Sequence, residues 1–507
     1  MAASFLAMAS IHAASDAELV LAENGTCDRQ IVIPDKAESE IVEQWLLMTA
    51  KLMEATFEKN GFEVDVVKES AKQTDKPGIY LGATKFAAQN GVTVDPSDLW
   101  AYRIKAVGRD LVISGNDNQD PIKTIQRLKT PLAMLGTVKG ACDFLREYAG
   151  VRFLFVNMSQ SQYASSGDGL GILDKDGSLK IDTRSVAFTP VRKIAVPADI
   201  DLKKTPMMRA NYDNAYETFY YIANNFFPPL SFVEGSEILW GVVILAKKYA
   251  QSHPEYFALL PDGKRSSELP IPARIRAISY CVTNTGVQNL MFEAAEQLIK
   301  NGEKTIAIGI QDGFGLCECN CADCNKLFGR KAENFEQVLA RGKSGKLWQG
   351  FFNITERIRK KYPEVRVVVL NYQDTPISSD IIQRFPENVI PRIQFGSQKD
   401  FDRLGGVEFP AGVCGFEETF TGFGQAGQYL PERTPKHMAE FVQTLKRNNV
   451  KWSARDGTIG NVRGMQAPAY YVYGRMMDDP SANWEAIQGE FYEAAFGNAA
   501  APMRTPC

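Results

Sequence analysis

Residues 304–315 have the sequence KTIAIGIQDGFG, in which a run of small and β-branched residues ends on Asp312 and a glycine-rich turn follows. A short apolar run bounded by turn signals is typical of a buried β-strand. The same pattern predicts strands at 192–197, 206–212, 276–282, 365–374, 389–396, 412–418 and 450–457. Amphipathic helices are predicted at 286–302, 347–363, 378–385 and 434–449. Strands that alternate with helices over about 300 residues indicate a (β/α)8 TIM-type barrel.

An open doubly wound sheet is the alternative for this region, but it usually has a glycine-rich first turn, which is missing here. We expect the barrel at residues 184–507. We expect a separate N-terminal α/β sandwich-like domain at residues 15–183, with strands at 18–23, 29–34 and 77–84, a helix at 37–57, and a helix that runs into a strand within 136–155. A hairpin at 102–116 should turn at Gly108–Asp110. No phosphate-binding glycine motif follows a predicted strand, so nucleotide binding has no support.

Composition narrows the function. The 507 residues are 45% apolar, which suffices for two or three domains, and the net charge of −3 gives no basic footprint for nucleic acid. Residues 2–14 (AASFLAMASIHAA) resemble the remnant of a secretory signal, so we expect an exported protein. A buried helix start is the alternative for this segment. Outside it no apolar run reaches the length of a membrane span. Only three histidines occur, which disfavours a histidine-rich metal centre or a Ser-His-Asp hydrolase.

Barrel enzymes carry their chemistry at the carboxyl ends of the strands, so these positions supply the candidate site. The predicted catalytic residues are Asp312, Glu417 and Glu418. Predicted substrate contacts at the strand ends and nearby turns are Arg209, Trp240, His253, Asn284, Tyr372, Asp374, Gln394, Trp452 and Arg455. Carboxylates and amides bind sugar hydroxyls, aromatic rings cover sugar faces, and glycosidic cleavage needs two carboxylates. These residues also have structural interpretations. Asp312 would then cap a turn, the two glutamates would form ordinary salt bridges, and His253 would belong to a buried His-Pro turn.

Four cysteines follow Asp312 closely, at positions 317, 319, 321 and 324. Their C-x-C-x-C-x-x-C spacing lacks the second, distant C-x-x-C pair of a zinc ribbon. A local disulfide is the preferred interpretation, with a zinc clip and free thiols as alternatives, and we predict structural cysteines without a metal or cofactor. Cys27, Cys142, Cys281 and Cys414 are isolated in the sequence, and Cys142 is predicted to lie in a core.

Three motifs resemble those of bacterial proteins that carry the domain of unknown function 4838: SHPEYFALLPDGKR (252–265), GIQDGFGLCECNCADC (309–324) and APAYYVYGRMMDDPS (467–481). The N-terminal segment resembles the non-catalytic domain of alpha-glucuronidases and hexosaminidases. These resemblances imply a glycoside hydrolase-like barrel and a glycan substrate. Relative to the family pattern, Cys317 is an additional cysteine. The chain ends at AAAPMRTPC (499–507), so we expect a truncated C-terminus.

We therefore expect a secreted glycoside hydrolase that cleaves a complex polysaccharide or oligosaccharide. A catalytically inactive, glycan-binding barrel is the alternative, because binding and cleavage need the same polar and aromatic lining. Arg209, Arg392 and Arg455 lie at or near strand ends, which favours an acidic sugar, although salt bridges to the carboxylates explain them equally well.

Overall fold

The computed structural model describes residues 17–119 (except 97 and 99), 133–154, 186–211 (except 207), 222–227, 236–237, 248–268, 281–309 (except 282), 319–328, 347–370, 382–394, 398–418 (except 403), 434–456 (except 451) and 463–504. The chain divides into two compact units of mixed α/β structure. Unit 1 comprises Met1–Pro228, Phe420–Gln443 and Gly457–Cys507, and unit 2 comprises Pro229–Thr419 and Thr444–Asp456.

Unit 1 is built on a six-stranded mixed sheet in the order β12-β5-β6-β4-β2-β3. These strands are β2 (Gln30–Ile33), β3 (Asp65–Lys68), β4 (Gly78–Leu81), β5 (Tyr102–Val107), β6 (Asp110–Gly115) and β12 (Asp201–Lys204). Strands β2, β3, β4 and β6 are parallel, and β5 is antiparallel to β6 and β12. Every residue of β2 is buried, including the apolar run Ile31–Ile33, so this sheet lies between two layers.

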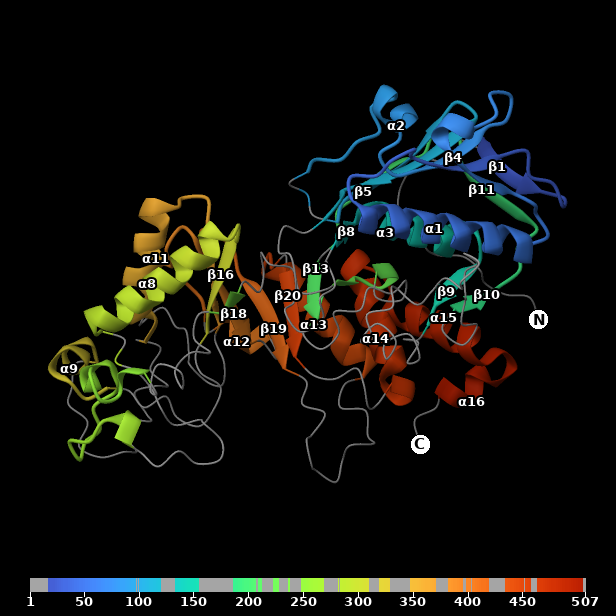
Figure 1. The fold of residues 1–507 in the computed structure, drawn as a ribbon. Helices are drawn as coiled ribbons and strands as arrows, with labels where there is room; N and C mark the ends of the chain where they lie inside the picture. The colour runs from blue at the N-terminus through green and yellow to red at the C-terminus, as the bar shows by residue number, and fades with distance from the viewer. Residues whose placement is uncertain are drawn as a thin grey trace. The chain divides into compact units, whose positions relative to one another are not determined.

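Helices cover both faces of this sheet. Helices α1 (Glu40–Lys59) and α3 (Gly136–Tyr148) lie side by side on one face, and the short α2 (Lys85–Gln89) lies on the other (Figure 1). The apolar positions of α1, among them the fully buried Trp45, recur with helical periodicity and face the sheet. Ser39 caps α1 by accepting a hydrogen bond from the Val42 N–H at 3.4 Å. Cys142 in α3 is fully buried, as predicted.

Shorter strands complete the N-terminal part of unit 1. Strand β1 (Glu18–Glu23) pairs with β11 (Lys193–Pro197), β9 (Val151–Phe153) with β10 (Val186–Phe188), and β7 (Asp117–Gln119) with β8 (Ala133–Leu135), all antiparallel. The predicted strand at 192–197 is therefore correct, but its partner is β1 and not a strand of the following β-then-α region. Strands β13 (Met208–Asn211) and β14 (Phe226–Phe227) form a parallel pair.

The C-terminal helices α14 (Arg463–Asp478), α15 (Trp484–Phe496) and α16 (Ala500–Arg504) also belong to unit 1. A buried ionic network joins α14 to α3. The Lys139 ammonium lies 2.8 Å from Asp143 and 3.0 Å from Asp478, and the Arg146 guanidinium lies 2.8 Å from Asp143. All four side chains are less than 10% exposed. Pairing and hydrogen bonding compensate the cost of burying these charges.

Unit 2 contains six consecutive strands that pair in parallel in the order β20-β19-β18-β17-β16-β15. They are β15 (Ser236–Glu237), β16 (Thr305–Gly309), β17 (Arg366–Leu370), β18 (Val389–Gln394), β19 (Cys414–Glu418) and β20 (Trp452–Asp456). The strands predicted from residue 304 onward are thus present. Val367, Val368 and Val369 are all fully buried, so both faces of β17 are covered.

Helices precede the strands of unit 2, as the sequence predicts. Helices α8 (Thr285–Lys300) and α11 (Leu347–Lys361) pack together beside β16 (Figure 1). The shorter helices are α9 (Ala322–Phe328) and α12 (Gln398–Asp402), and α13 (Pro435–Arg447) leads toward β20. The helix predicted at 378–385 is not found over its described part. Residues 382–385 are non-helical, and Arg384 forms a parallel bridge with Glu408.

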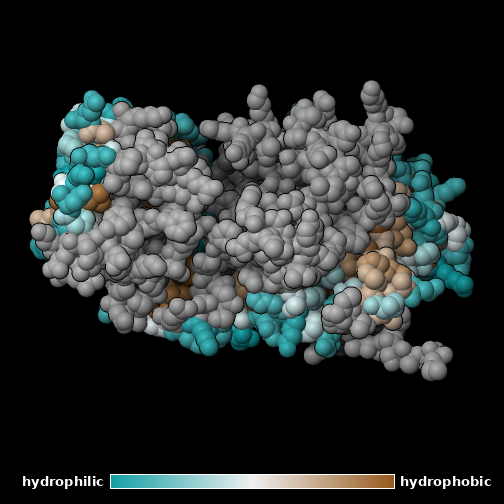
Figure 2. Space-filling model, turned by 90° about the horizontal axis from the view of Figure 1, so that it is seen from below, coloured by the Kyte–Doolittle hydropathy of each residue, from teal (hydrophilic) through white to brown (hydrophobic). Residues whose placement is uncertain are grey.

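The described surface is largely polar. In the space-filling view of Figure 2, hydrophilic residues make up most of the coloured surface, and apolar residues form smaller areas between them. Within the described ranges, the exposed large hydrophobic side chains are Val20, Leu47, Leu202 and Met503. None of the helices in these ranges combines the length and the apolar character that crossing a bilayer requires.

Candidate functional site

The carboxyl ends of β18, β19 and β20 bring predicted site residues together. In the parallel register, Gln394 is the partner of Phe416, Glu417 of Arg455, and Glu418 of Asp456. Gln394, Glu418 and Asp456 are the last residues of their strands, and parallel strands end at the same edge of a sheet. This edge, which we call the acidic edge, therefore combines three carboxylic acids with an arginine and an amide.

The strands position these residues because their preceding segments are apolar and buried. Ile393 is 4% exposed, and Cys414 is fully buried. Apart from the small, fully buried Ser453 of β20, the polar residues gather where the strands leave the core, which is the pattern of a parallel sheet that carries function at its carboxyl edge. Arg392 is an exception, because it is 5% exposed inside β18, opposite Cys414 in the register.

The remaining predicted site residues are distributed as follows. Asp312, Cys317, Trp240, Tyr372 and Asp374 lie outside the described residues. Arg209 is part of β13, and Trp452 is the first residue of β20. Trp452 is thus at the opposite end of β20 from Arg455.

Asn284 contacts the turn that follows His253, at the start of α8. Asn284 is the N-cap of this helix, and its side-chain oxygen accepts a hydrogen bond from the Val287 N–H at 3.1 Å. Its amide nitrogen donates to the Glu255 carbonyl at 3.4 Å. These contacts give Asn284 a structural role in addition to any contact with a ligand.

His253 begins a one-turn 3₁₀ helix, Pro254–Tyr256, and is not buried. Its ring stacks on Tyr256 with 4.6 Å between the centroids, and its Nδ1 lies 3.1 Å from a carboxylate oxygen of Glu255. Tyr256 in turn packs against Gly286, where a Cβ atom would come within 2.4 Å of the ring. The glycine therefore allows the His-Pro turn to dock on the start of α8.

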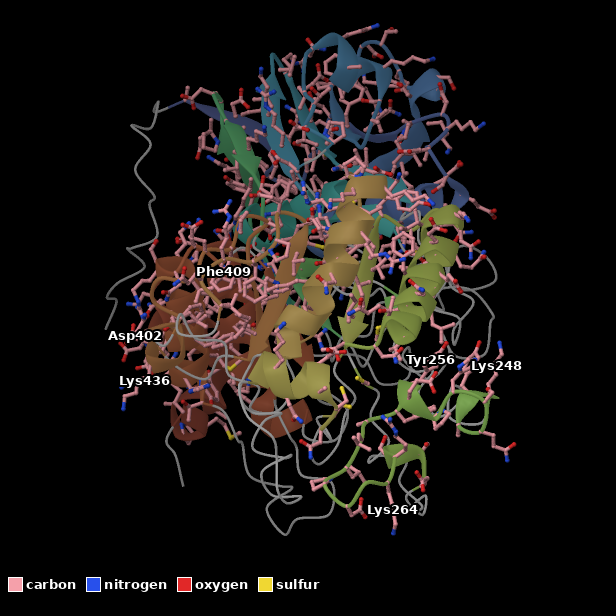
Figure 3. All side chains as sticks on the ribbon, turned by 90° about the vertical axis from the view of Figure 1, so that its left-hand side faces the viewer. Lys248, Tyr256, Lys264, Asp402, Phe409 and Lys436 are labelled. Atoms are coloured by element: carbon pink, nitrogen blue, oxygen red, sulfur yellow. The ribbon has the colours of Figure 1, made fainter. Side chains whose placement is uncertain are left out.

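Four cysteines form a second cluster in unit 2. The Sγ atoms of Cys281, Cys319, Cys321 and Cys324 all lie within 4.8 Å of one another. Cys281 Sγ is 3.6 Å from that of Cys321 and 3.7 Å from that of Cys324. An S–S bond is about 2.05 Å long, so these described cysteines are free thiols and not the predicted local disulfide. Ala258, Leu259 and Leu260 pack on this cluster, and Figure 3 labels Tyr256 and Lys264 on either side of them in the chain.

Cys281 is the member that sequence reasoning missed. It stands alone in the sequence, and its partners are 40 and 43 residues away from it. The signal that could have found it was the C-x-C-x-x-C triplet of Cys319, Cys321 and Cys324, because a closed structural zinc site takes four protein ligands and so needs one more from elsewhere in the chain.

Close packing changes how these thiols ionise. Hydrogen bonds from the Cys319 and Cys324 thiols favour the Cys281 thiolate and lower its pKa to about 2. The contact with Cys281 raises the pKa of Cys319 to about 12, and it raises the pKa of Cys324 as well. The cluster thus stabilises one negative charge, and further thiolates beside it require a compensating cation.

A surface cavity of about 350 Å³ opens at the other edge of the unit 2 sheet. Its lining comprises Arg359, Pro363, Glu364, Val365, Arg366, Glu387, Asn388 and Ala411. Arg366 begins β17 and Asn388 precedes β18, so the cavity lies at the amino ends of the strands. Residues at that end of parallel α/β folds usually serve stability, and we assign this cavity no substrate.

Comparisons with known proteins give one family and several distant structures. The profile of the domain of unknown function DUF4838 matches residues 182–397 and 416–506. No curated protein matches the chain. Similar solved structures include that of CpGH84D, which is 8% identical with a TM-score of 0.39 over 97% of this chain and 71% of that one.

Two further solved structures are also similar to this chain at low sequence identity. A family 89 glycoside hydrolase from Clostridium perfringens in complex with PUGNAc is 10% identical, with a TM-score of 0.42 over 78% of this chain and 47% of that one. A GH138 enzyme targeting pectin rhamnogalacturonan II is 10% identical, with a TM-score of 0.27 over 92% and 55% of the two chains. The chain thus spans about half the length of each of these two proteins.

Proposed function

The chain belongs to the DUF4838 family, and we propose that it is a glycoside hydrolase that cleaves a polysaccharide or oligosaccharide with a pair of carboxylates. The observation that carries this proposal is the acidic edge, where Glu417 and Glu418 of β19 are in register with Arg455 and Asp456 of β20. Such an edge offers carboxylates for proton transfer and for stabilising an oxocarbenium-like transition state. Arg455 offers charge-assisted hydrogen bonds to a sugar oxygen or carboxylate.

The proposed fold around this edge is a (β/α)8 barrel. Six strands of unit 2 follow one another in chain order and pair in parallel, and described helices lie between all consecutive pairs except β17 and β18. Two more parallel strands, β13 and β14, precede them in the chain. Eight consecutive parallel strands are the number that a TIM-type barrel needs. This proposal would bring the carboxyl ends of β15 to β20 to one mouth.

Within this site, Asp312 is the proposed partner of one glutamate of β19. Asp312 follows β16 in the sequence by three residues. Neighbouring residues of a strand point to opposite faces, so Glu417 and Glu418 cannot both face the same substrate. The distance between the two carboxyl groups would set the stereochemistry, about 5 Å for retention and about 6.5–9.5 Å for inversion.

The test is a glycan panel on which hydrolysis and binding are measured together. Asp312→Asn should lower turnover of the substrate found by about 10²- to 10⁴-fold, while binding and thermal stability stay close to wild type. Of Glu417→Gln and Glu418→Gln, one should match this loss, and the other is its matched control. Binding without release of sugar by the wild-type protein would contradict hydrolysis and would support a catalytically inactive glycan-binding protein.

Export is part of the same proposal, since polymeric glycans are met outside the cell. Its support is the apolar segment at residues 2–14, which resembles a secretory signal. Fractionation of expressing bacteria, followed by N-terminal sequencing, tests it. Protein that stays in the cytoplasm with residues 2–14 intact would contradict export.

A further inference from the structure

The four-cysteine cluster of unit 2 has the composition and geometry of a metal site. We propose that Cys281, Cys319, Cys321 and Cys324 bind one structural zinc ion as a tetrahedral tetrathiolate. This proposal concerns the folding of unit 2 and stands independently of the proposed hydrolase activity.

Distances between the sulfur atoms support a tetrahedral ion. Zinc–sulfur bonds of about 2.3 Å place neighbouring sulfurs of a tetrahedron about 3.8 Å apart. The separations from Cys281 Sγ are 3.6 Å to Cys321 and 3.7 Å to Cys324. Both are far too long for a disulfide, and the whole group fits within 4.8 Å. An iron–sulfur cube between the cysteines would hold their sulfurs farther apart than this.

The surroundings of the sulfurs are those of bound thiolates. The Leu259 N–H donates to Cys319 Sγ at 3.2 Å. The Thr283 hydroxyl lies 3.1 Å from Cys324 Sγ and 3.3 Å from Cys281 Sγ, so it can donate to either. Hydrogen bonds of this kind orient metal ligands and spread the negative charge of a tetrathiolate. Cys281, Cys319 and Cys324 are buried, which keeps water from the proposed ion.

Zinc would join separate segments of unit 2. Cys281 comes just before α8, Cys319 and Cys321 precede α9, and Cys324 lies within α9. A short segment, residues 256–265, packs on the cluster. Two backbone hydrogen bonds of 2.8 Å connect them, from the Asn320 N–H to the Leu259 carbonyl and from the Cys281 N–H to the Tyr256 carbonyl. The ion would therefore fix the start of α8 and the far end of the segment that leaves β16.

Around residues 258–260, the cysteine sulfurs take the place of a larger hydrophobic core. Its apolar members are small, comprising Ala258, Leu260 and the cysteines, with Leu259 partly buried. Such a cluster buries little surface compared with a sheet core, and small units with little apolar burial commonly depend on a metal. We therefore expect this region to lose its structure when the ion is removed.

Metal analysis of the full chain, purified without chelator, is the first test. We expect about one zinc per chain and an X-ray absorption spectrum fitted by four sulfurs at about 2.3 Å. Replacement by Co²⁺ should give the strong visible bands and the thiolate-to-cobalt charge-transfer bands of a tetrahedral site. Absence of zinc, iron in its place, nitrogen or oxygen ligands, or a disulfide among these cysteines would each overturn the proposal.

Variants assign the ligands. Cys281→Ser and Cys324→Ser should bring the zinc content close to zero, and Cys27→Ser, a partly buried cysteine of unit 1, is the matched control that should retain it. Full zinc with an unchanged four-sulfur spectrum in Cys281→Ser would show that the geometry is misassigned. If the variants fail to fold, the Co²⁺ spectrum of the wild-type chain decides alone.

Hydrogen exchange tests the structural role. Chelation of the zinc should abolish protection of the Leu259 and Cys281 amides, whereas amides of α1 and α3 in unit 1 should keep theirs. Removal of the ion without any change at Leu259 and Cys281 would contradict a structural zinc.

Discussion

Asp143 is the most heavily paired carboxylate in the ionic network of unit 1. It accepts hydrogen bonds from Lys139 and Arg146, both at 2.8 Å, and from the hydroxyl of Tyr102. Asp143→Asn leaves the buried cations undercompensated and should lower the free energy of unfolding by about 3–5 kcal/mol in urea titrations. Asp201→Asn is the matched control. It breaks the more exposed pair with Arg103 and should cost at most about 1 kcal/mol.

The same carboxylate predicts a pH dependence. Burial by itself raises the pKa of Asp143, but the positive charges of Lys139 and its cationic neighbours outweigh burial and lower that pKa well below the ordinary value. A depressed folded-state pKa contributes stability above the unfolded pKa of about 3.9, and this contribution is lost as the pH falls through the folded pKa. As the pH is lowered below 4, the urea midpoint of unfolding should therefore fall less steeply for Asp143→Asn than for the wild type. If the urea midpoints of the wild type and of Asp143→Asn fall with the same slope below pH 4, the pH dependence does not come from Asp143.

At the scale of elements, α3 packs unusually close to its sheet. A Cβ atom on Gly140 would lie 2.8 Å from the Tyr102 ring and 3.0 Å from Ile113. Gly140→Ala should therefore destabilise unit 1 by about 1–3 kcal/mol, although alanine favours a helix by about 1 kcal/mol. Gly489→Ala in α15 meets only the mobile end of Arg504 and should be neutral or stabilising. Equal effects of the two substitutions on thermal unfolding would rule out the close-packing explanation.

Helix α8 allows the two roles of Asn284 to be separated. As the N-cap, Asn284→Ala should cost about 1 kcal/mol, whereas Asn284→Ser should retain most of the stability, because serine also caps helices. If Asn284 also binds substrate, both variants should raise KM on the glycan identified in the panel. An unchanged KM in both variants would leave only the capping role.

Elements with strong local signals were predictable. The hairpin of β5 and β6 turns at Gly108, which has a φ of 60° that favours glycine, and Val107 pairs with Asp110. Elements decided by tertiary partners were not predictable. Residues 382–385 have a helical pattern, but the Phe385 N–H donates to the Glu408 carbonyl at 2.9 Å, a contact that local periodicity cannot reveal.

In the candidate site, too, the positions with local sequence signals were predictable and those decided by tertiary contacts were not. Alternation of strands and helices in the sequence placed Glu417, Glu418 and Arg455 at strand ends, and the register confirms that these positions are neighbours. The cysteine cluster depended on long-range folding, because Cys281 lies 40 and 43 residues before its partners Cys321 and Cys324. The spacing of the triplet Cys319, Cys321 and Cys324 indicates that a fourth ligand is wanted, but it does not say which cysteine supplies it.

At the scale of the whole molecule, unit 1 is assembled from separate parts of the chain. The helices α14 to α16 pack into the same unit as the N-terminal sheet, and Asn225 donates a hydrogen bond to the Gly474 carbonyl at 2.8 Å. Without Asp478, the buried Lys139 and Arg146 lose one of their two carboxylates. The N-terminal sheet and its helices should therefore depend on the last segment of the chain.

A fragment of residues 15–204 tests this dependence. We expect its α3 amides to exchange much faster than in the full chain, and joining residues 463–504 to the fragment through a flexible linker should restore much of the protection. Asp478→Asn in the full chain is the control with a single substitution. It should also speed exchange of the α3 amides, by lowering their free energy of opening by about 3 kcal/mol, the cost of an undercompensated buried charge. If the α3 amides exchange equally slowly in the fragment and in the full chain, the N-terminal domain is stable without the C-terminal helices. The ionic network with α14 would then serve only to bind those helices.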